Sequence, residues 1–455
     1  MRLILATCLA LSLPALAEKP NVLFIAIDDL RPELGCYGAE QVKTPHIDKL
    51  AGESLLLNRA YCQIAVCGAS RASLMTGIWP TPKRYITYTS RADEDTPGAK
   101  TLPQVFKEAG YTTISNGKIF HYPQDSGEQS WSQPAWRSKS KGGRGLDPTT
   151  REKLSQRKRG RIYEMPDVED GAYADGDTAR QTIADLKRLK EEGKPFFLAC
   201  GFFKPHLPFY APKRYWNLYD REKIVLADNR QRPKGAPGAL KGSGEFRSYH
   251  LAGMDEKSDE FHAVMRHGYL ACVSYVDKLV GDVLAELDKQ GLADNTIVVL
   301  WGDHGFHLGE HEFWGKHNTM TLSSRVPLIV KAPGGKAGPS QALVETSDIF
   351  PTLCELAGLE APKSVQGKSF VTLTKDPSAK FREAAFCRFG PGDGVFTDGF
   401  SYTRYKDGSE MLYDLAKDPQ ENVNLIKDKA HAATAEKMRK LLDERQAAAK
   451  AWKLK

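Results

Sequence analysis

The sequence has no paired cysteine motif and, beyond its N-terminus, no apolar run long enough to cross a membrane. Its eight cysteines are scattered without a Cys-x-x-Cys spacing, which argues against zinc-knuckle and dithiol redox sites. Neither sign of charge dominates, because 64 basic and 57 acidic side chains give a formal charge of +7 over 455 residues. With 41% hydrophobic and 27% charged residues, the composition is that of an ordinary globular protein.

The N-terminus carries the one long apolar stretch. Arg2 precedes the run Leu3 to Leu16, and Ala15-Leu16-Ala17 fits a small-x-small cleavage site. Residues 1–17 therefore predict a secretory signal peptide and an exported protein that is periplasmic or secreted. Removal of this segment lowers the formal charge to +6 and leaves seven cysteines. An odd number leaves at least one thiol unpaired or modified, and Cys67 is the candidate.

Apolar strands alternate with capped helices along most of the chain. The run 21–27 predicts a strand that is buried on both faces, as parallel strands are. Further strands are expected at residues 111–115, 195–201, 296–301 and 326–331, and helices at residues 44–50, 101–110, 177–192, 259–290 and 347–356. This alternation predicts an α/β fold with a large, mainly parallel sheet that is flanked by helices.

Beyond about residue 366 the pattern changes to short strands that are followed by one helix. The strand-like pieces lie at residues 384–389, 394–397, 400–405 and 411–415, and an amphipathic helix is expected at 431–452. These pieces predict an antiparallel meander. We therefore expect a large domain at 18–365 and a smaller C-terminal α+β domain at 366–455.

Residues 137–161 carry ten basic side chains and little apolar content. A solvated insertion loop is the expected structure. The alternative is a basic rim that attracts a polyanionic glycan. Nucleic acid is not an expected partner, because no aromatic stacking platform or known nucleic-acid-binding module accompanies the segment.

Carboxylates follow two of the expected strands. Asp28-Asp29 comes after strand 21–27, and Asp303-His304 comes after strand 296–301. In open α/β sheets, ligand sites form at the carboxyl ends of the strands, so both motifs could face one crevice. Carboxylates that share a site repel one another unless a cation neutralises them, and hard oxygen ligands suit Ca²⁺ or Mg²⁺. Either motif alone is more often a cap or turn.

The run Cys67-Gly-Ala-Ser-Arg71 places a thiol beside a fixed cation. The planar guanidinium of Arg71 offers a fork of donors that suits a tetrahedral oxyanion. A half-buried free cysteine near a surface arginine is the alternative, because cysteine is among the most buried residue types.

Four more candidate residues stand in separate short motifs: Lys118, His121, His206 and Lys316. Each alone would by default be a surface cation or a packed histidine. Together with the strand-end carboxylates, they describe a metal-assisted hydrolase of a sulfuryl or phosphoryl ester.

The order of these motifs closely resembles that of the formylglycine-dependent, type I sulfatases of the alkaline-phosphatase superfamily. The motifs are Asp-Asp after a strand, Cys-x-Ala-Ser-Arg, Gly-Lys-x-x-His, Lys-Pro-His, Asp-His-Gly and Trp-Gly-Lys. Residues 303–311 and 117–121 are most similar to the iduronate-2-sulfatase branch, and residues 411–425 resemble the sulfatase C-terminal pattern.

The resemblance implies a sulfuric ester hydrolase whose catalytic domain spans 18–365. It implies that a sulfatase-maturing enzyme oxidises Cys67 to 3-oxoalanine (formylglycine), the catalytic nucleophile. Ala69 stands where many relatives have proline, a variant associated with the oxygen-independent type of maturase. One Ca²⁺ per chain would be bound by Asp28, Asp29, modified Cys67, Asp303 and His304.

The resemblance also implies a role for each remaining candidate. Arg71 would position the formylglycine, while Lys118 and Lys316 would bind sulfate oxygens. His121 would orient the hydrated aldehyde, and His206 would protonate the leaving alcohol.

The branch resemblance favours a sulfated uronic acid from a glycosaminoglycan or other polysaccharide as the substrate. Candidate sugar contacts flank the shared motifs: Trp314, His307, Tyr85, Tyr88 and Arg84. Arg84 or His307 could pair with a uronate carboxylate, whereas the alternative is that the aromatic side chains only pack. Two other functions stay open, a phosphomonoester or phosphonate-ester hydrolase of the same superfamily and a non-catalytic glycan-binding relative.

Overall fold

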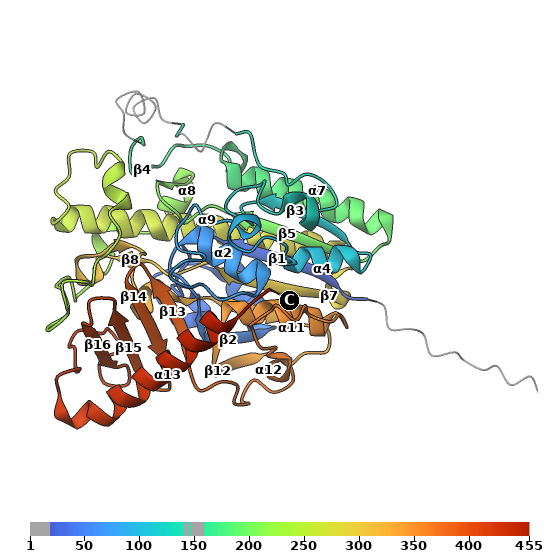
Figure 1. Ribbon diagram of the computed structural model, residues 1–455. Coiled ribbons are helices and arrows are strands. Elements are labelled where there is room, and N and C mark those ends of the chain that lie inside the picture. Colours follow the sequence, from blue (N-terminus) through green and yellow to red (C-terminus); the bar gives the residue numbers. More distant parts are fainter. Residues whose placement is uncertain (1–18, 141–144, 147–158, 455) are drawn as a thin grey trace, which may run out of the picture.

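The centre of the fold is an eight-stranded sheet (Figure 1). The strand order is β10-β2-β11-β7-β1-β5-β3, and β12 pairs with β2. The strands are β1 (Asn21–Ile27), β2 (Leu55–Tyr61), β3 (Thr112–Gly117), β5 (Phe196–Phe202), β7 (Thr296–Gly302), β10 (Arg325–Val326), β11 (Leu328–Lys331) and β12 (Gly338–Glu345). Strands β7, β1, β5 and β3 are parallel, whereas β11 is antiparallel to β7 and β2. The predicted large, mainly parallel sheet is confirmed.

The structure is a computed structural model that describes residues 19–140, 145–146 and 159–454. The predicted signal peptide and most of the basic segment 137–161 lie outside the described residues. Within the described ranges, no helix is both long and apolar enough to cross a bilayer.

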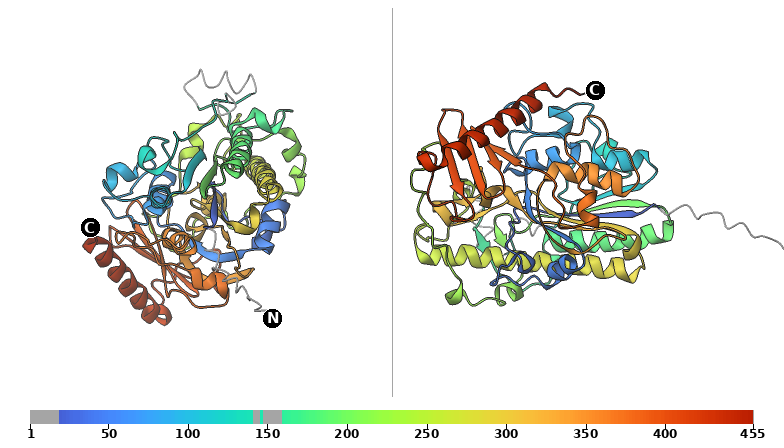
Figure 2. Two further views of the ribbon diagram at one scale, coloured as in Figure 1. Left: turned by 90° about the vertical axis from the view of Figure 1, so that its right-hand side faces the viewer. Right: turned by 90° about the horizontal axis from the view of Figure 1, so that it is seen from below.

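Helices cover both faces of the sheet, because successive side chains of a buried strand point to opposite faces. In β1, Leu23 and Ile25 pack on one side, and Val22 and Phe24 pack on the other. One core includes residues from α1 (Pro45–Gly52), α7 (Ala174–Glu192) and α9 (Asp259–Lys289). The other includes residues from α2 (Cys67–Thr76), α4 (Leu102–Glu108) and α11 (Ile349–Leu356). Figures 1 and 2 show the sheet between these two helical layers.

The helix ends follow local signals in the sequence. Thr101 caps α4 through a capping box with Gln104, and the Ser258 hydroxyl accepts the N–H of Phe261 at the start of α9. Gly193, with φ of 63°, ends α7 in the left-handed conformation.

Two strands of the sheet were not expected from the sequence. β2 contains Asn58 and Arg59 within an otherwise apolar run, and β12 begins with Gly338 and Pro339, which are typical of loops. The predicted strand 326–331 is divided into β10 and β11 at Pro327, which has no N–H to donate to a neighbouring strand.

The C-terminal part forms the predicted antiparallel meander with one closing helix. The strands are β13 (Ala385–Phe389), β14 (Gly392–Phe396), β15 (Phe400–Tyr405) and β16 (Glu410–Asp414), and the helix is α13 (Ala432–Ala451). Val395, Tyr402 and Leu412 pack against Met438 and Leu442 of α13. The domain boundary at residue 366 stays a prediction.

Short elements connect these parts. They are α3 (Ala92–Asp95), α5 (Gly127–Ser130), β4 (Tyr163–Glu164), β6 (Phe209–Tyr210), α8 (Lys213–Trp216), η5 (Glu245–Ser248), β8 (His307–Leu308), β9 (Trp314–Gly315), α10 (Thr321–Ser324) and α12 (Val371–Lys375).

Candidate active site

The ends of β1 and β7 bring three carboxylates together. Asp28 and Asp29 follow β1, Asp303 follows β7, and all three residues are fully buried. The Asp28 N–H donates to the Phe202 carbonyl at 3.1 Å, and the Asp29 N–H donates to Asp303 Oδ1 at 3.1 Å. Asp29 has a φ of 61°, a left-handed conformation that the surrounding structure must hold. The two motifs thus meet at the carboxyl edge of the sheet.

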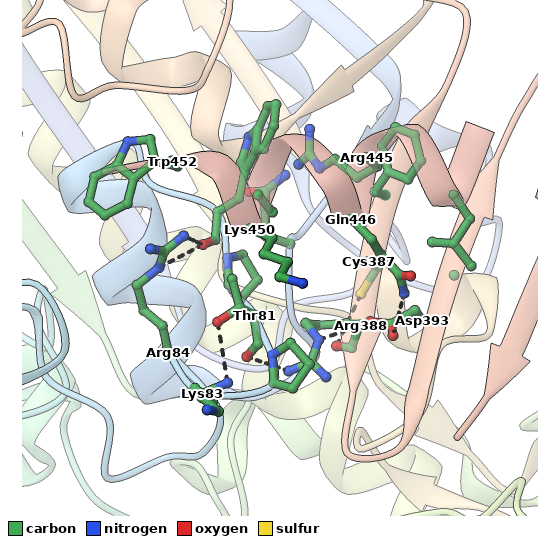
Figure 3. A pocket seen from close by; sticks show the side chains of 18 residues that line it. Thr81, Lys83, Arg84, Cys387, Arg388, Asp393, Arg445, Gln446, Lys450 and Trp452 are labelled. Carbon is green, nitrogen blue, oxygen red and sulfur yellow. Dashed lines mark hydrogen bonds and ion pairs between the residues drawn. The ribbon is translucent and has the colours of Figure 1, made fainter. Parts of the chain in front are cut away.

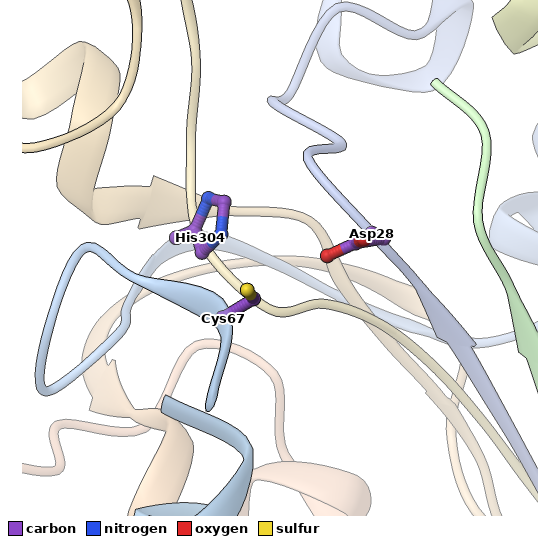
Figure 4. A group of neighbouring side chains, drawn as sticks. All are labelled: Asp28, Cys67 and His304. Carbon is purple, nitrogen blue, oxygen red and sulfur yellow. The ribbon is translucent and has the colours of Figure 1, made fainter. Parts of the chain in front are cut away.

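His304 completes a cluster of possible metal ligands. Four ligand atoms lie within 4.8 Å of one another, from Asp28, Asp29, Asp303 and His304. The sulfur of Cys67 also lies within 4.8 Å of a ligand atom of Asp28 and of His304 (Figure 4). His304 Nδ1 lies 3.0 Å from the Gly305 carbonyl, which only accepts hydrogen bonds, so this nitrogen carries the proton.

The other ring nitrogen of His304 indicates a cation. Nε2 has no hydrogen-bond partner among the described residues, and it lies 3.3 Å from Asp29 Oδ1. A buried imidazole nitrogen that is left unpaired beside carboxylate oxygens is well placed to be a metal ligand, and the hydrogen bond at Nδ1 orients the ring for that role. The donor set therefore fits a divalent metal ion.

Cys67 is the first residue of α2 and lies beside this cluster. Gly68 allows a close approach of the chain, because a Cβ at this position would lie 2.0 Å from the Tyr88 carbonyl oxygen. The Ser70 hydroxyl donates to the Asp303 carbonyl at 2.5 Å. The start of α2 is thus held against both β7 and the loop around Tyr88.

Arg71 is fully buried and lies against two of the carboxylates. Its Nε donates to Asp303 Oδ2 at 2.8 Å, and its Nη2 lies 3.4 Å from Asp28 Oδ1. Its Nη1 donates to the carbonyls of Lys118 and Ile119. Burial lowers the pKa of Arg71, but Asp303 and Asp28 outweigh it and raise the pKa.

Lys118 follows β3 and forms an ion pair with Asp28. Burial raises the pKa of Asp28, but the nearby charges of Lys118, His206 and Arg71 hold it well below its usual range. Asp28 is therefore an ionised acceptor at neutral pH. Burial lowers the pKa of Lys118, but Asp28 outweighs this effect, so the pKa is raised.

Lys316 lies between two carboxylates. Its Nζ is 2.8 Å and 2.9 Å from the two carboxylate oxygens of Asp29 and 3.1 Å from Glu245 Oε2. Burial lowers the pKa of Lys316, but Asp29 and Glu245 raise it well above the usual value. Burial also raises the pKa of Asp29 to about 6, against the opposite effects of His206 and Lys316.

His206 faces the same two carboxylates. Its Nδ1 lies 2.5 Å from the Leu207 carbonyl, so this nitrogen carries a proton. Its Nε2 lies 3.4 Å from Glu245 and 4.0 Å from Asp29. Burial lowers the pKa of His206, and the two carboxylates oppose this effect. The loop before it is held by Asp175, which accepts the N–H groups of residues 203 and 204.

His121 contacts Cys67 directly, with Nδ1 3.3 Å from the sulfur. Burial lowers the pKa of His121 to about 4, and the charge of Lys118 adds to this effect. The ring is therefore neutral at neutral pH. The exposed ring of Tyr88 lies beside it, with 5.9 Å between the ring centroids.

The pattern of strand-end carboxylates, cysteine and cations has counterparts in known proteins. A family model described as Sulfatase matches residues 20–359. The chain belongs to the sulfatase family. A second model, described as N-sulphoglucosamine sulphohydrolase, C-terminal, matches residues 309–448. This sulfatase is 35% identical to human iduronate 2-sulfatase over 395 residues, which are 77% of this chain and 71% of that protein.

Solved structures share the fold of this sulfatase. One of them is a protein solved in complex with its substrate, D-glucosamine-2-N,6-O-disulfate. It matches this chain with a TM-score of 0.76 and 23% sequence identity, and the match covers 95% of this chain and 98% of that protein's chain. The phosphonate monoester hydrolase of Agrobacterium radiobacter also has a TM-score of 0.76, with 24% identity, and covers 94% of this chain and 96% of its own. At these identities, the comparison shows the fold alone. The predicted membership of the sulfatase family, with similarity to iduronate 2-sulfatase, is confirmed.

Two of the expected sugar contacts are packed away from the carboxylate cluster of the sulfatase. Trp314 is 3% exposed, and its ring contacts those of Phe261 and His262. His307 is fully buried and pairs with the Asn318 side chain. The structure does not bring these two side chains to the site, because tertiary packing turns them into the core.

Arg84 and Tyr85 are also held elsewhere. Arg84 donates to the Trp79 carbonyl and lies over the Trp452 ring, with 4.4 Å to the ring centroid. Tyr85 is fully buried, and its hydroxyl lies 2.9 Å from Thr76 Oγ1. Of the five expected sugar contacts, the exposed ring of Tyr88 is the one that lies beside a candidate catalytic residue.

Two residues of the site carried no motif signal that predicted their place in it. Glu245 contacts both Lys316 and His206. Arg137, from the basic segment, is half-buried and donates to the carbonyls of residues 120 and 121 at 2.8 Å and 2.9 Å. Arg137 thus supports the loop that carries His121, and its place differs from the solvated insertion that was expected for this segment.

Proposed function

We propose that this sulfatase hydrolyses a sulfate ester on a uronic acid unit of a sulfated polysaccharide, with formylglycine at position 67 and one Ca²⁺. The supporting observation is the convergence of Cys67 with the cluster around Asp28 and His304 and with the cations Arg71 and Lys118. A side chain that can be modified, set beside a cluster of possible metal ligands and several buried cations, suits the transfer of a sulfuryl group.

The buried cations would bind the sulfate group. Lys118, Lys316 and Arg71 each carry a raised pKa, so they stay charged at neutral pH. Fixed cations in a site that excludes water stabilise the charge that develops on the equatorial oxygens in the transition state. Their ion pairs with Asp28 and Asp29 hold them in position before the substrate enters.

His206 is suited to protonate the departing sugar oxygen. With Nδ1 committed to the Leu207 carbonyl, the proton to be transferred would be held on Nε2, where Glu245 and Asp29 favour it against burial, which lowers the pKa of His206. A positioned acid of this kind contributes about 10²–10⁴-fold in rate. His121, which is neutral, would orient the group formed at position 67 through its contact there.

Two groups complete the site in the active enzyme. Asp28, Asp29, Asp303, His304 and the modified residue 67 would hold the Ca²⁺, which supplies Lewis-acid polarisation of a sulfate oxygen. Formylglycine, as its hydrate, supplies the hydroxyl groups for displacement at sulfur and for release of sulfate. A sulfatase-maturing enzyme is therefore an expected partner, and export by the N-terminal signal is the expected route to a periplasmic or secreted location.

The choice of a uronate rests on the similarity to human iduronate 2-sulfatase. The test is release of inorganic sulfate from a matched pair of disaccharides, one sulfated at O2 of the uronic acid and the other at O6 of the glucosamine. We expect release from the first alone, and none from the Cys67→Ala variant. Release from the second alone would contradict the uronate assignment.

Two further readouts test the mechanism and the alternative activity. Peptide mass spectrometry of protein from its native host should find an aldehyde in place of the thiol at position 67. A retained thiol in fully active protein would contradict the formylglycine proposal.

Aryl sulfate and aryl phosphonate esters with the same leaving group should differ in kcat/KM in favour of the sulfate. The opposite order would indicate the phosphonate-ester hydrolase.

A further inference from the structure

A cavity lies between the loop 79–84, the β13–β14 hairpin and α13 (Figure 3). Its volume is about 510 Å³, within the range of small-molecule sites. None of the candidate residues of the Cys67 site except Arg84 lines it. Its charged lining consists of five cations and one carboxylate, which favours an anion: Lys83, Arg84, Arg388, Arg445, Lys450 and Asp393.

Two lysines at this cavity keep their charge unneutralised. Arg388 donates to Asp393 at 2.9 Å, and Arg445 lies 3.1 Å from a carboxylate oxygen of Glu345, so these two arginines have partners. Lys83 and Lys450 are exposed, and neither forms an ion pair within the part of the chain that the structure describes. Lys83 comes from the loop and Lys450 from α13, so the two ammonium groups border the cavity from different elements (Figure 3).

The wall of the cavity also contains buried donors without acceptors. Gln63 is 2% exposed, and its Oε1 accepts the Thr346 hydroxyl at 2.7 Å and the Ser347 N–H at 2.9 Å. These two bonds fix the amide, and its Nε2 is left with no partner among the described residues. Trp79 Nε1 is likewise buried and unpartnered over the described ranges. Gln63 and Trp79 both line the cavity, so these unpaired donors, which are costly where they are buried, lie in its wall.

Aromatic rings provide the apolar part of the lining. Trp79, Phe386 and Trp452 contribute side chains to it. The Trp452 indole is held in place, because its Nε1 donates to the Ser364 carbonyl at 2.8 Å and Arg84 lies over its ring. Aromatic faces combined with a few convergent polar groups are typical of sites for ligands that are both apolar and hydrogen-bonding, as sugar rings are.

We infer that this cavity binds an anionic sugar unit, one that carries sulfate or carboxylate groups, at a place separate from the reacting centre. The choice of a sugar as the carrier of the anion rests on the proposed function, whereas the anion preference rests on the cavity itself.

The segments that line the cavity also contact segments of the Cys67 site. The Arg388 N–H donates to the Gln63 carbonyl at 2.9 Å, in the segment that leads to Cys67. The next residue, Phe389, stacks on His317 with 4.7 Å between ring centroids.

Charge reversal at the two unpaired lysines tests the inference. Lys450→Glu and Lys83→Glu would be compared with Lys440→Glu, an exposed lysine of the same helix that does not line the cavity. The probe is a heparin-derived hexasaccharide, titrated by calorimetry into the full chain that carries Cys67→Ala to prevent turnover. We expect each cavity variant to weaken binding about tenfold or more, and the control to change it less than about twofold.

Matched probes separate the possible ligands. The chemically desulfated hexasaccharide should bind more weakly than the sulfated one, and inorganic sulfate alone should not reproduce the affinity. Equal binding by both cavity variants and the parent would overturn the inference, and so would inorganic sulfate that binds as tightly as the hexasaccharide. When Lys83→Glu and Lys450→Glu are made in protein that keeps Cys67, its turnover of a sulfated disaccharide is expected to stay unchanged. Failure of the proposed function would abolish that turnover in the parent itself, so the two failures are distinguishable.

Discussion

Lys316 and Asp29 form a two-point ion pair in which Nζ lies 2.8 Å and 2.9 Å from the two carboxylate oxygens. Asp29 is fully buried and Lys316 is 2% exposed, so neither charge is compensated by water. Loss of one partner from a buried pair leaves an unpaired charge and typically costs about 3–5 kcal/mol. The pair therefore both fixes the turn after β1 and keeps a cation at the site.

Replacement of Lys316 by methionine tests this relationship. We expect Lys316→Met to lower kcat/KM by about 10² or more, because a fixed cation at the sulfate is lost, and to lower the melting temperature by several degrees. Lys331→Met is the matched control, because Lys331 forms a partly exposed pair with Glu53 at 2.8 Å that is worth at most about 1 kcal/mol. Equal effects of the two substitutions would contradict the role assigned to Lys316.

Removal of the metal should destabilise the protein before any substrate is added. Asp28, Asp29 and Asp303 are fully buried, and His304 Nε2 has no partner among the described residues. A chelator is therefore expected to lower the melting temperature, and Ca²⁺ to restore it. Asp303→Asn should reduce the response to Ca²⁺. Unchanged melting of the parent with chelator and with Ca²⁺ would count against a metal at this cluster.

Glu245 should act by positioning Lys316 and by raising the proton affinity of His206, whose Nε2 is 3.4 Å away. Burial lowers the pKa of His206, and the Glu245 carboxylate opposes this effect. In Glu245→Gln the pKa of His206 should fall. Activity that needs protonated His206 is then lost at lower pH, so the basic limb of the kcat/KM profile shifts to lower pH.

The control for this profile is Glu256→Gln. Glu256 forms a surface pair with Arg247 at 2.9 Å, on the 3₁₀ helix that Glu245 begins. This substitution should leave the pH profile unchanged. A Glu245→Gln variant with lower kcat but an unmoved basic limb would show that Glu245 does not act on His206.

The strands that carry the site could be predicted from the sequence because their signal is local. β1 is apolar at almost every position and is followed at once by Asp28, so both the strand and its ligand residue are visible together. β12 is different. It is partly polar and begins with Gly338-Pro339, and its place in the sheet comes from pairing with the distant β2.

The side chains around the site were less predictable because tertiary packing decides where they point. Trp314 and His307 adjoin the catalytic motifs along the chain, yet both face the core. Glu245 reaches the site from a four-residue 3₁₀ helix with no apolar periodicity, and its contacts with His206 and Lys316 join distant segments. The motifs thus pointed to the candidate residues within them. Closeness to a motif along the chain did not predict which other side chains reach the site.

Glu421 should make the stability of the fold depend on pH. Burial raises the pKa of its carboxyl to about 7, while the Ser401 hydroxyl and the Thr321 N–H oppose this effect. The folded state therefore binds this proton more tightly than the unfolded state, in which the pKa is about 4.5. The stabilisation is fully present below about pH 4.5 and is lost as the pH rises through about 7. At about 1.4 kcal/mol for each pKa unit, the change amounts to about 3 kcal/mol.

The Glu421→Gln variant cannot titrate, so this component of the pH dependence should disappear. Urea unfolding between about pH 5 and pH 8 measures the free energy of unfolding at each pH, provided that the m-value is constant. The decline with rising pH should be smaller in Glu421→Gln than in the parent, whereas Glu436→Gln should match the parent, because Glu436 is exposed on α13. If Glu421→Gln followed the parent curve at every pH, the buried carboxyl would already be ionised in the folded state. The hydrogen bonds from Ser401 and Thr321 would then outweigh its burial.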